Sequence, residues 1–275
     1  MGLEGKQLWH PGFPRANHYH PDWVTSSGSG GAHALWLTEW LSEAMDFQPG
    51  QRVLDLGCGR AASSIFLARE FGLQVWAADL WFSVADNWRR VQDAGVSDRV
   101  FPLHVDARAL PFPPEFFDAI ISIDSFFYYG TDDLYLSYLA RLLRPGGRLG
   151  TAGVGLTEEF TELPEHLRGW WTNDLWCLHS ADWWLRHWGR TGLVDVRLAE
   201  SRPDGYQLWL DWQRVIAPEN EPELSTVAED AGRYLTYVRV VADRRPGVTI
   251  DEPITSVPGG DYERRPLLRP DAQAG

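Results

Sequence analysis

The sequence has few cysteines and no long apolar run. Its 275 residues include only 2 cysteines, too few for a framework of disulfide bonds, so a reducing cytoplasm is the expected compartment. No uninterrupted apolar stretch is long enough to span a bilayer, and the first residues lack the apolar core of a signal peptide. We therefore expect a soluble, cytoplasmic protein without a membrane partner.

Positive charge is also in deficit. The formal net charge at pH 7 is -13, because 25 lysine and arginine residues stand against 38 aspartate and glutamate residues. Binding to a phosphate backbone requires a basic surface, so this balance argues against a nucleic-acid partner. The simpler consequence of the charge is solubility. The oligomeric state stays open at this stage.

Tryptophan, by contrast, is abundant, with 15 residues in the chain. Some of them must belong to the core, but so many also indicate aromatic walls around an apolar or cationic substrate. The length and the hydrophobic content of 44% are those of one sizeable globular domain with appendages.

The stretch 53–64 has the pattern of a buried strand, a glycine turn and the start of a helix. Residues 53–56 supply the apolar side chains of a strand that is covered on both faces. Gly57 and Gly59 allow the backbone to turn sharply and a ligand to approach closely. The helix that follows would present its free N–H groups and the positive end of its dipole to that ligand.

These glycines also fit the dinucleotide-binding pattern, so alone they do not separate NAD from other nucleotide-like ligands. No Gly-Lys-Ser/Thr follows the turn, which excludes a phosphate-cradling P-loop. Three further apolar stretches each end at an acidic residue: 74–78 before Asp79, 100–105 before Asp106 and 117–123 before Asp124. A fifth strand is expected after the turn at 144–147.

With these blocks in place, the chain resembles the class I S-adenosylmethionine-dependent methyltransferases, of the type often called methyltransferase domain 11. Four of that family's blocks occur in order within residues 33–200: Asp-Leu-Gly-Cys-Gly at 55–59, the acidic end of the second strand, Asp-Ala-Arg-Ala-Leu-Pro-Phe at 106–112 and Leu-Arg-Pro-Gly-Gly at 143–147. The resemblance implies an α/β, Rossmann-like fold. Its seven-stranded sheet would be mostly parallel with an antiparallel last strand, with helices on both faces and an aromatic-rich lid.

The resemblance also implies S-adenosylmethionine as the cofactor. The Asp79 carboxylate would hold the ribose hydroxyls, Leu80 would pack on adenine, and Asp106 and Ala107 would hydrogen-bond to the adenine ring. For Asp106, the structural alternative is a role in a turn or a helix cap. For Trp81, which comes just after Asp79 and Leu80, the alternative is a place in the core. The full set of expected cofactor contacts is Asp55, Gly57, Cys58, Gly59, Asp79, Leu80, Asp106, Ala107, Ile123 and Asp124.

The acceptor is expected between the arm, the loop after the fourth strand and the lid. The expected acceptor contacts are Tyr19, Trp23, Phe127, Tyr128, Trp170, Trp171 and Trp176. His166 and His179 are the lid candidates for a general base, because histidine titrates near neutral pH. Asp124 could hold a cationic acceptor or accept a proton. For each histidine alone, a surface or core role is the alternative.

The organisation expected along the chain has three parts. Residues 1–32 form an N-terminal arm, which either folds over the cofactor or is partly disordered. The methyltransferase domain would cover 33–245, with a lid insertion at about 155–180 and a helical insertion at about 204–232. Residues 246–275 would form a flexible or wrapping tail. His18 and His20 have a spacing that suits a metal, but no third ligand is indicated, so no metal is expected.

These observations predict methyl transfer to a small aromatic, amine or hydroxyl-bearing metabolite. No Asn-Pro-Pro-Tyr motif follows the fourth strand, which argues against methylation of DNA or of glutamine amides. Two alternatives stay open. One is a C-methyltransferase or cyclopropane-type enzyme that acts on an isoprenoid or lipid, where aromatic walls would stabilise a carbocation. The other is a regulatory protein that binds the cofactor without catalysis.

Overall fold

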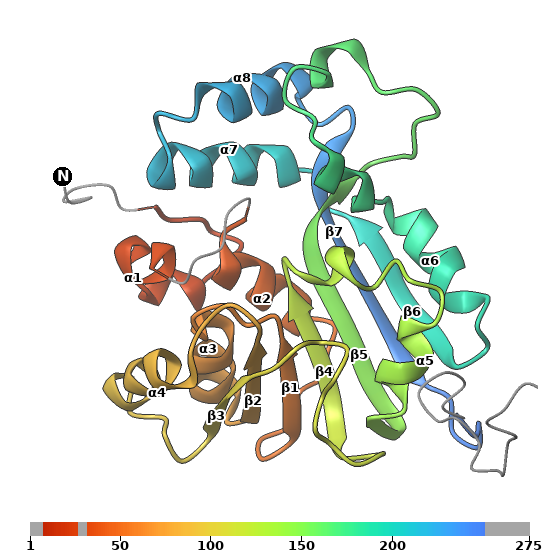
Figure 1. Ribbon diagram of the computed structural model, residues 1–275. Coiled ribbons are helices and arrows are strands. Elements are labelled where there is room, and N and C mark those ends of the chain that lie inside the picture. The colour runs from red at the N-terminus through yellow and green to blue at the C-terminus, as the bar shows by residue number, and fades with distance from the viewer. Residues whose placement is uncertain (1–7, 27–31, 251–275) are drawn as a thin grey trace, which may run out of the picture.

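A central sheet with helices packed around it organises the protein in the computed structural model, which describes residues 8–26 and 32–250 (Figure 1). The sheet has seven strands in the order β3-β2-β1-β4-β5-β7-β6. The strands are β1 (Arg52–Leu56), β2 (Gln74–Asp79), β3 (Val100–His104), β4 (Phe117–Ile123), β5 (Leu143–Leu156), β6 (Val194–Ser201) and β7 (Leu235–Arg244). β7 runs in the direction opposite to the other six strands. The expected Rossmann-like sheet with an antiparallel last strand is confirmed.

The order of the strands reverses between β1 and β4. The chain proceeds outward from β1 through β2 to β3 and then returns to place β4 on the other side of β1, where Val53 is paired with Ala119. Val53 and Ile120 are fully buried, because both central strands are covered on both faces. In open α/β sheets, ligands bind beyond the carboxyl ends of the strands at such a reversal.

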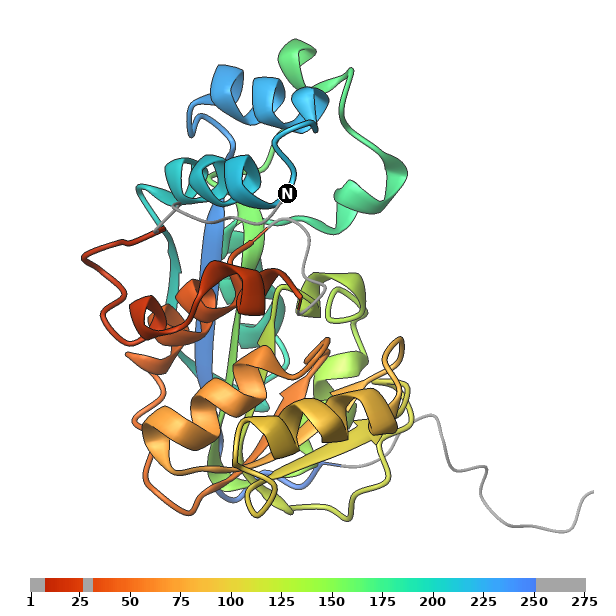
Figure 2. The ribbon, with the colours of Figure 1, turned by 90° about the vertical axis from the view of Figure 1, so that its left-hand side faces the viewer.

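Helices cover both faces of the sheet, and Figure 2 shows α2 and α3 on one side of the strands and α5 on the other. A Cβ atom on Gly150 would lie 2.5 Å from the sulfur of Met45, just after α2, whereas one on Gly153 would lie 3.2 Å from the Phe127 ring. Both faces of β5 are therefore tightly packed. The helices are α1 (Pro21–Thr25), α2 (Ala34–Ser42), α3 (Ala62–Phe71), α4 (Val84–Asp93), α5 (Tyr135–Ala140), α6 (Ala181–Gly189), α7 (Gly205–Ile216) and α8 (Glu221–Asp230), with short 3-10 helices η1 (Ala16–His18), η2 (Phe126–Tyr128), η3 (Glu165–Leu167) and η4 (Asn173–Cys177).

Side-chain caps set the first residues of α2 and α4. His33 Nδ1 accepts a hydrogen bond from the Trp36 amide (3.1 Å), so α2 begins at the following residue, Ala34. The Ser83 hydroxyl accepts an amide hydrogen bond from the first turn of α4 (3.1 Å). Side-chain caps of this kind set the first residue of a helix.

A second layer lies above the upper edge of the sheet, where α7, α8 and the segment 157–178 gather (Figure 1). α7 packs against β7, and α8 packs against η3. The segments expected as a lid and as a helical insertion thus lie beside each other, over the edge at which β1 and β4 end. Of the expected arm and tail, 1–7, 27–31 and 251–275 lie outside the described residues.

Candidate active site

A cavity of about 670 Å³ lies beyond the carboxyl ends of β1, β2 and β4. We call its two parts the glycine end and the aromatic end. The glycine end is formed by residues 57–59, 78–82 and 105–108. The aromatic end is formed by Asp124, Phe127, Tyr128, Trp170, Asp174, Leu175, Trp209 and Glu223.

The turn after β1 strongly favours glycine at position 57. Gly57 has φ +72°, and an added Cβ atom would lie 2.1 Å from the Ser125 hydroxyl oxygen. The amides of Gly57 and Cys58 donate to the carbonyl of Ala78 (2.9 and 3.1 Å), which ties the turn to the end of β2. Gly59 also has a positive φ, of +56°. The backbone at this end of the cavity is therefore held in one conformation.

Asp79 joins the turn after β1 to the loop after β2. Its Oδ2 accepts the Gly59 amide (2.8 Å), and its Oδ1 accepts the amides of Trp81 (2.7 Å) and Phe82 (3.3 Å). A carboxylate offers about four lone-pair sites, so these amides leave it some capacity to accept from a ligand. Trp81 is 80% exposed, so its alternative placement in the core is wrong.

Asp106 lies in a turn and also in the wall of the cavity. Its Oδ1 accepts the Arg108 amide (2.8 Å) in the turn after β3, and the residue also lines the cavity together with Ala107. The Tyr135 hydroxyl donates to the Ala107 carbonyl (3.0 Å) and holds this loop against α5. Leu80 lines the same end and is 52% exposed.

Asp55 supports the cavity from behind and does not line it. Its Oδ2 accepts the hydroxyls of Ser63 and Ser64 (both 2.6 Å) at the start of α3. Burial raises the pKa of Asp55 to about 6. The side chain thus fixes the start of α3, and Ser63 lines the cavity where Asp55 does not. A direct contact of Asp55 with the cofactor stays a prediction.

Asp124 lies where the two ends of the cavity meet. It has φ +52°, and its Oδ1 accepts the Val154 amide (3.3 Å). Burial raises the pKa of Asp124 to about 6, and the negative charge of Glu223 contributes in the same direction. Its predecessor Ile123, an expected cofactor contact, also lines the cavity.

Tyr129 lines the cavity beside the glycine turn. Its hydroxyl lies 3.0 Å from the Ser122 hydroxyl and 3.1 Å from that of Ser125, and it donates to the Leu56 carbonyl (3.3 Å). Burial raises the pKa of Tyr129, so the phenol stays neutral. It lies at the end of η2, in the loop that was expected at the reversal of the sheet.

The aromatic end is built largely from helices that follow the parallel strands in the chain. Trp170 and Trp209 pack edge to face, with ring centroids 6.0 Å apart. Trp209 Nε1 donates to Glu223 Oε1 (2.7 Å), and Asn220 Nδ2 donates to Glu223 Oε2 (2.8 Å). Trp209 and Glu223 were missed in the sequence, where the tryptophans of α7 were the available signal.

The comparisons with known proteins agree with this geometry. Residues 53–147, about a third of the 275 residues, match a family model described as a methyltransferase domain. Methyltransferase GfsG of Streptomyces halstedii is 38% identical over 119 residues, which are 43% of this chain and 43% of that protein. Over residues 53–147, this chain is therefore similar to methyltransferases. The match spans less than half the length of that relative.

Solved structures share the fold of the methyltransferase domain at low sequence identity. The geranyl diphosphate C-methyltransferase from Streptomyces coelicolor A3(2), in complex with Mg2+, geranyl diphosphate and S-adenosyl-L-homocysteine, superposes with a TM-score of 0.64 and 20% identity over 75% of this chain and 78% of that chain. The [4+2]-cyclase SpnF superposes with a TM-score of 0.62 and 21% identity, over 80% of this chain and 86% of that chain. The fold therefore does not by itself determine the reaction.

Several expected acceptor contacts of the methyltransferase domain lie outside the cavity. Phe127, Tyr128 and Trp170 line it, whereas Trp171 and Trp176 pack with Phe160 at centroid distances of 5.4 and 6.0 Å. These rings lie next to the wall of the cavity, because Trp171 contacts Trp170 edge to face at a centroid distance of 6.3 Å.

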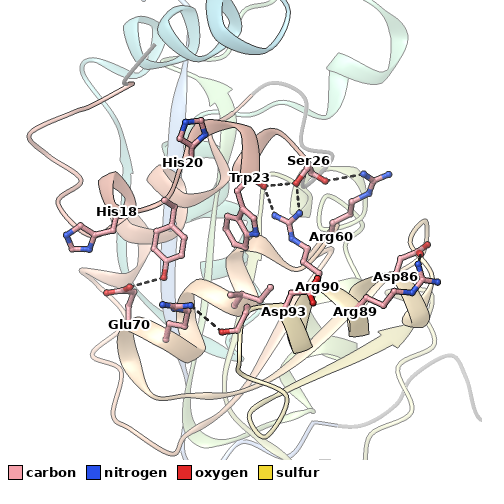
Figure 3. A pocket seen from close by; sticks show the side chains of 14 residues that line it. His18, His20, Trp23, Ser26, Arg60, Glu70, Asp86, Arg89, Arg90 and Asp93 are labelled. Carbon is pink, nitrogen blue, oxygen red and sulfur yellow. Dashed lines mark hydrogen bonds and ion pairs between the residues drawn. The ribbon is translucent and has the colours of Figure 1, made fainter. Parts of the chain in front are cut away.

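Tyr19 and Trp23 line a second hollow, between the arm and helices α3 and α4 (Figure 3). The Tyr19 hydroxyl donates to Glu70 (2.8 Å), and the Arg90 guanidinium lies over the Trp23 ring at 4.2 Å. Neither ring lines the cavity, and the contact of Tyr19 and Trp23 with the acceptor stays a prediction.

The two lid histidines also face other partners. His166 Nε2 lies 2.8 Å from Asp230 Oδ1, and both side chains are buried. His179 Nδ1 lies 3.1 Å from Glu159 Oε2, and its ring is stacked on Trp183 at 3.7 Å. The structure brings neither into the lining of the cavity, and the role of either histidine as a general base stays a prediction. Of the three expected catalytic residues, only Asp124 lines it.

Within residues 8–26 and 32–250, no group of three or more histidine, cysteine, aspartate or glutamate side chains could hold a metal ion. His18 and His20 belong to the arm and line the second hollow, and Figure 3 shows their rings apart. In the same part of the chain, no helix has the length and apolar character needed to cross a membrane.

Proposed function

We propose that this chain is an S-adenosylmethionine-dependent methyltransferase whose acceptor is a small molecule bound at the aromatic end. One observation carries the proposal: a single cavity joins the glycine turn of a methyltransferase domain to a pocket with aromatic walls, and Asp124 lies between them. A nucleoside at one end and an acceptor at the other would then meet beside Asp124.

The glycine end fits the cofactor. Gly57 and Gly59 give it a backbone without side chains, and Asp79 keeps capacity to accept from the hydroxyls of a ribose. The Asp106 carboxylate can accept from the amino group of adenine. When bound, S-adenosylmethionine supplies a methyl group on a positively charged sulfur, which is a strong electrophile.

The residues of the chain then have modest tasks, namely to orient the acceptor and to exclude water. Apolar walls serve both tasks, and they are formed by Trp170, Trp209 and Phe127. Asp124, with its pKa raised to about 6, can take up a proton from an acceptor more readily than an ordinary aspartate. We assign it the role of holding positive charge at the junction of the two ends.

The test is calorimetry with S-adenosylhomocysteine, followed by an assay for its release from S-adenosylmethionine with a panel of amines, phenols, indoles and lipids. We expect binding that Asp79→Ala weakens by about 10-fold to 100-fold, since hydrogen bonds to a charged group contribute about 1.5–3 kcal/mol. Asp93→Ala, in the exposed last turn of α4, serves as the matched control. Absence of binding by the unaltered protein would contradict the proposal.

The same walls favour a second candidate, C-methylation of an isoprenoid or lipid. Aromatic faces such as those of Trp170 and Trp209 stabilise a carbocation by the electrostatics of their rings. A diphosphate head group would need cations, and the cation in the lining, Arg108, belongs to the glycine end. The candidate is therefore limited to acceptors without a diphosphate, and the lipid members of the panel test it.

The proposal includes a cytoplasmic location and no nucleic-acid partner. Cys58 and Cys177 are both free thiols, which supports a reducing compartment. The net charge of -13 opposes binding to a phosphate backbone. Fractionation of the native host cells and a gel-shift assay with duplex DNA test the two points.

A further inference from the structure

The aromatic end carries negative charge without a cation beside it. Asp124, Asp174 and Glu223 line this end, and among the described residues no lysine, arginine or histidine does. Arg108 lies at the other end, where its Nη1 is 4.0 Å from Asp106 Oδ1. Carboxylates next to apolar walls lose part of their hydration, and a positive partner restores the lost stabilisation.

Glu223 is held in a fixed orientation at this end. One oxygen accepts Trp209 Nε1 (2.7 Å) and the other accepts Asn220 Nδ2 (2.8 Å). Each oxygen thereby keeps a second lone pair, so the carboxylate can accept further hydrogen bonds. Burial raises the pKa of Glu223, because the charged carboxylate is less well hydrated there. A bound cation would stabilise that charge.

The aromatic rings around Glu223 suit the apolar part of a ligand whose positive charge lies at Glu223. Trp209 contacts Trp170 edge to face and lies parallel to Tyr237, at centroid distances of 6.0 and 6.2 Å. Trp209 therefore both fixes the carboxylate and presents an aromatic surface to the cavity. Indole rings attract cations over their faces and pack well against apolar groups.

We propose that Glu223 selects an acceptor that carries a protonated amine, with Trp170 and Trp209 packed against the acceptor's apolar body. The inference rests on the proposed function and deepens it, because it assigns the charge of the acceptor. An ammonium group has three donors and no acceptor, which complements the spare lone pairs of Glu223. A carboxylate or phosphate at the same place would meet like charges and no cation.

The experiment uses the full chain saturated with S-adenosylhomocysteine, so that no turnover occurs. Calorimetry compares ligands that have one body and three head groups: tryptamine, tryptophol and indole-3-propionate, and the corresponding phenyl and octyl series. We expect at least one amine to bind 10-fold or more tightly than its alcohol, and the carboxylates to bind more weakly than the alcohols.

Glu223→Gln is the test variant and Glu229→Gln the control, an exposed glutamate on the same helix α8. Glu223→Gln keeps an oxygen for Trp209 and should abolish the preference for the amine, because the affinity of the amine falls to that of the alcohol. Glu229→Gln should leave the preference intact. Circular dichroism on melting shows whether each variant is folded, and binding of tryptophol to Glu223→Gln provides a second check.

Three results with the ligand series would overturn the inference: no amine binds, the carboxylate binds as tightly as the amine, or Glu223→Gln retains the preference for the amine. A fourth would be that Glu223→Gln weakens the binding of S-adenosylmethionine more than the binding of S-adenosylhomocysteine. The last would mean that the carboxylate serves the sulfonium of the cofactor. Failure of the proposed function has a different signature, because the protein would then not bind S-adenosylhomocysteine at all.

Discussion

The two ends of the cavity are built in different ways. The glycine end comes from loops directly after β1, β2 and β3, and backbone amides hold it together: Gly57 and Cys58 donate to Ala78, and Gly59 donates to Asp79. The aromatic end collects side chains from η2, η4, α7 and α8. Contacts between side chains, such as that of Trp209 with Glu223, hold it together.

This difference explains how one fold can serve many acceptors. The backbone of the glycine end is fixed by the sheet itself, so it keeps the same geometry whatever the surrounding side chains are. The aromatic end can change its chemistry by substitution in α7 or α8 without disturbing β1 or β2. Sites carried on segments outside a rigid scaffold commonly diverge in this way.

The largest effect is expected for Gly57→Ala, which changes the backbone turn at the glycine end. A residue with a Cβ atom at φ +72° costs about 1–2 kcal/mol, and the overlap with the Ser125 hydroxyl oxygen at 2.1 Å costs about 1–3 kcal/mol more. We expect a loss of about 2–5 kcal/mol in the free energy of unfolding and S-adenosylhomocysteine binding weakened by at least 100-fold. Urea titration and calorimetry measure the two quantities.

Gly95→Ala is the matched control, since Gly95 has φ +68° and nothing within 4 Å of the added Cβ atom. It should cost only the conformational part, about 1–2 kcal/mol, and leave ligand affinity unchanged. If the two variants bind S-adenosylhomocysteine equally well, the close approach at Gly57 has no role in binding, and the comparison between the two ends fails.

The next effect concerns Asp124, at the junction of the two ends. Burial raises its pKa from 3.8 to about 6, so the folded protein holds the proton more tightly than the unfolded chain. This contribution to stability is complete below about pH 4 and is lost as the pH rises to about 6. Asp124→Asn stays neutral and should gain stability over the unaltered protein across that window.

The gain should reach at most about 3 kcal/mol at pH 7, since one pKa unit corresponds to about 1.36 kcal/mol. Contact of Asp124 with water in the cavity reduces it below that limit. Urea titrations of both proteins at pH 4 and pH 7 measure the difference, with Glu229→Gln as the control for a general change of charge. A difference that is the same at both pH values would mean that Asp124 is not desolvated.

How much the sequence revealed differs between the same two ends. Gly57 and Asp79 were predictable because each directly follows a strand, and parallel strands bring such positions to one edge. Glu223 was not, because its place depends on how α7 and α8 fold over that edge. His166 drew attention as a titratable side chain, while its buried partner Asp230 lies 64 residues away, beyond the reach of local patterns.

A smaller effect, confined to the aromatic end, is expected for His166→Ala. Asp230 is fully buried, and its other oxygen accepts the amides of Tyr234 and Leu235 (3.1 and 2.8 Å) at the start of β7. Loss of the His166 partner leaves Oδ1 unsatisfied, which costs about 1–3 kcal/mol. His166→Gln can still donate and should recover part of it. Unchanged affinity for S-adenosylhomocysteine, by calorimetry, would show that the glycine end is independent of this support.

The smallest effect is expected for His179→Ala, which lies beside the aromatic end without lining it. The ring is stacked on Trp183 at 3.7 Å and paired with Glu159 at 3.1 Å, a half-exposed arrangement of the kind that contributes less than about 1 kcal/mol. Turnover with any acceptor should stay within about twofold, because no atom of His179 reaches the cavity. A loss of turnover with unchanged stability would instead mean that the segment 157–178, with the adjoining His179, moves inward on acceptor binding. The aromatic end would then be formed by its ligand, while the glycine end is formed by the sheet.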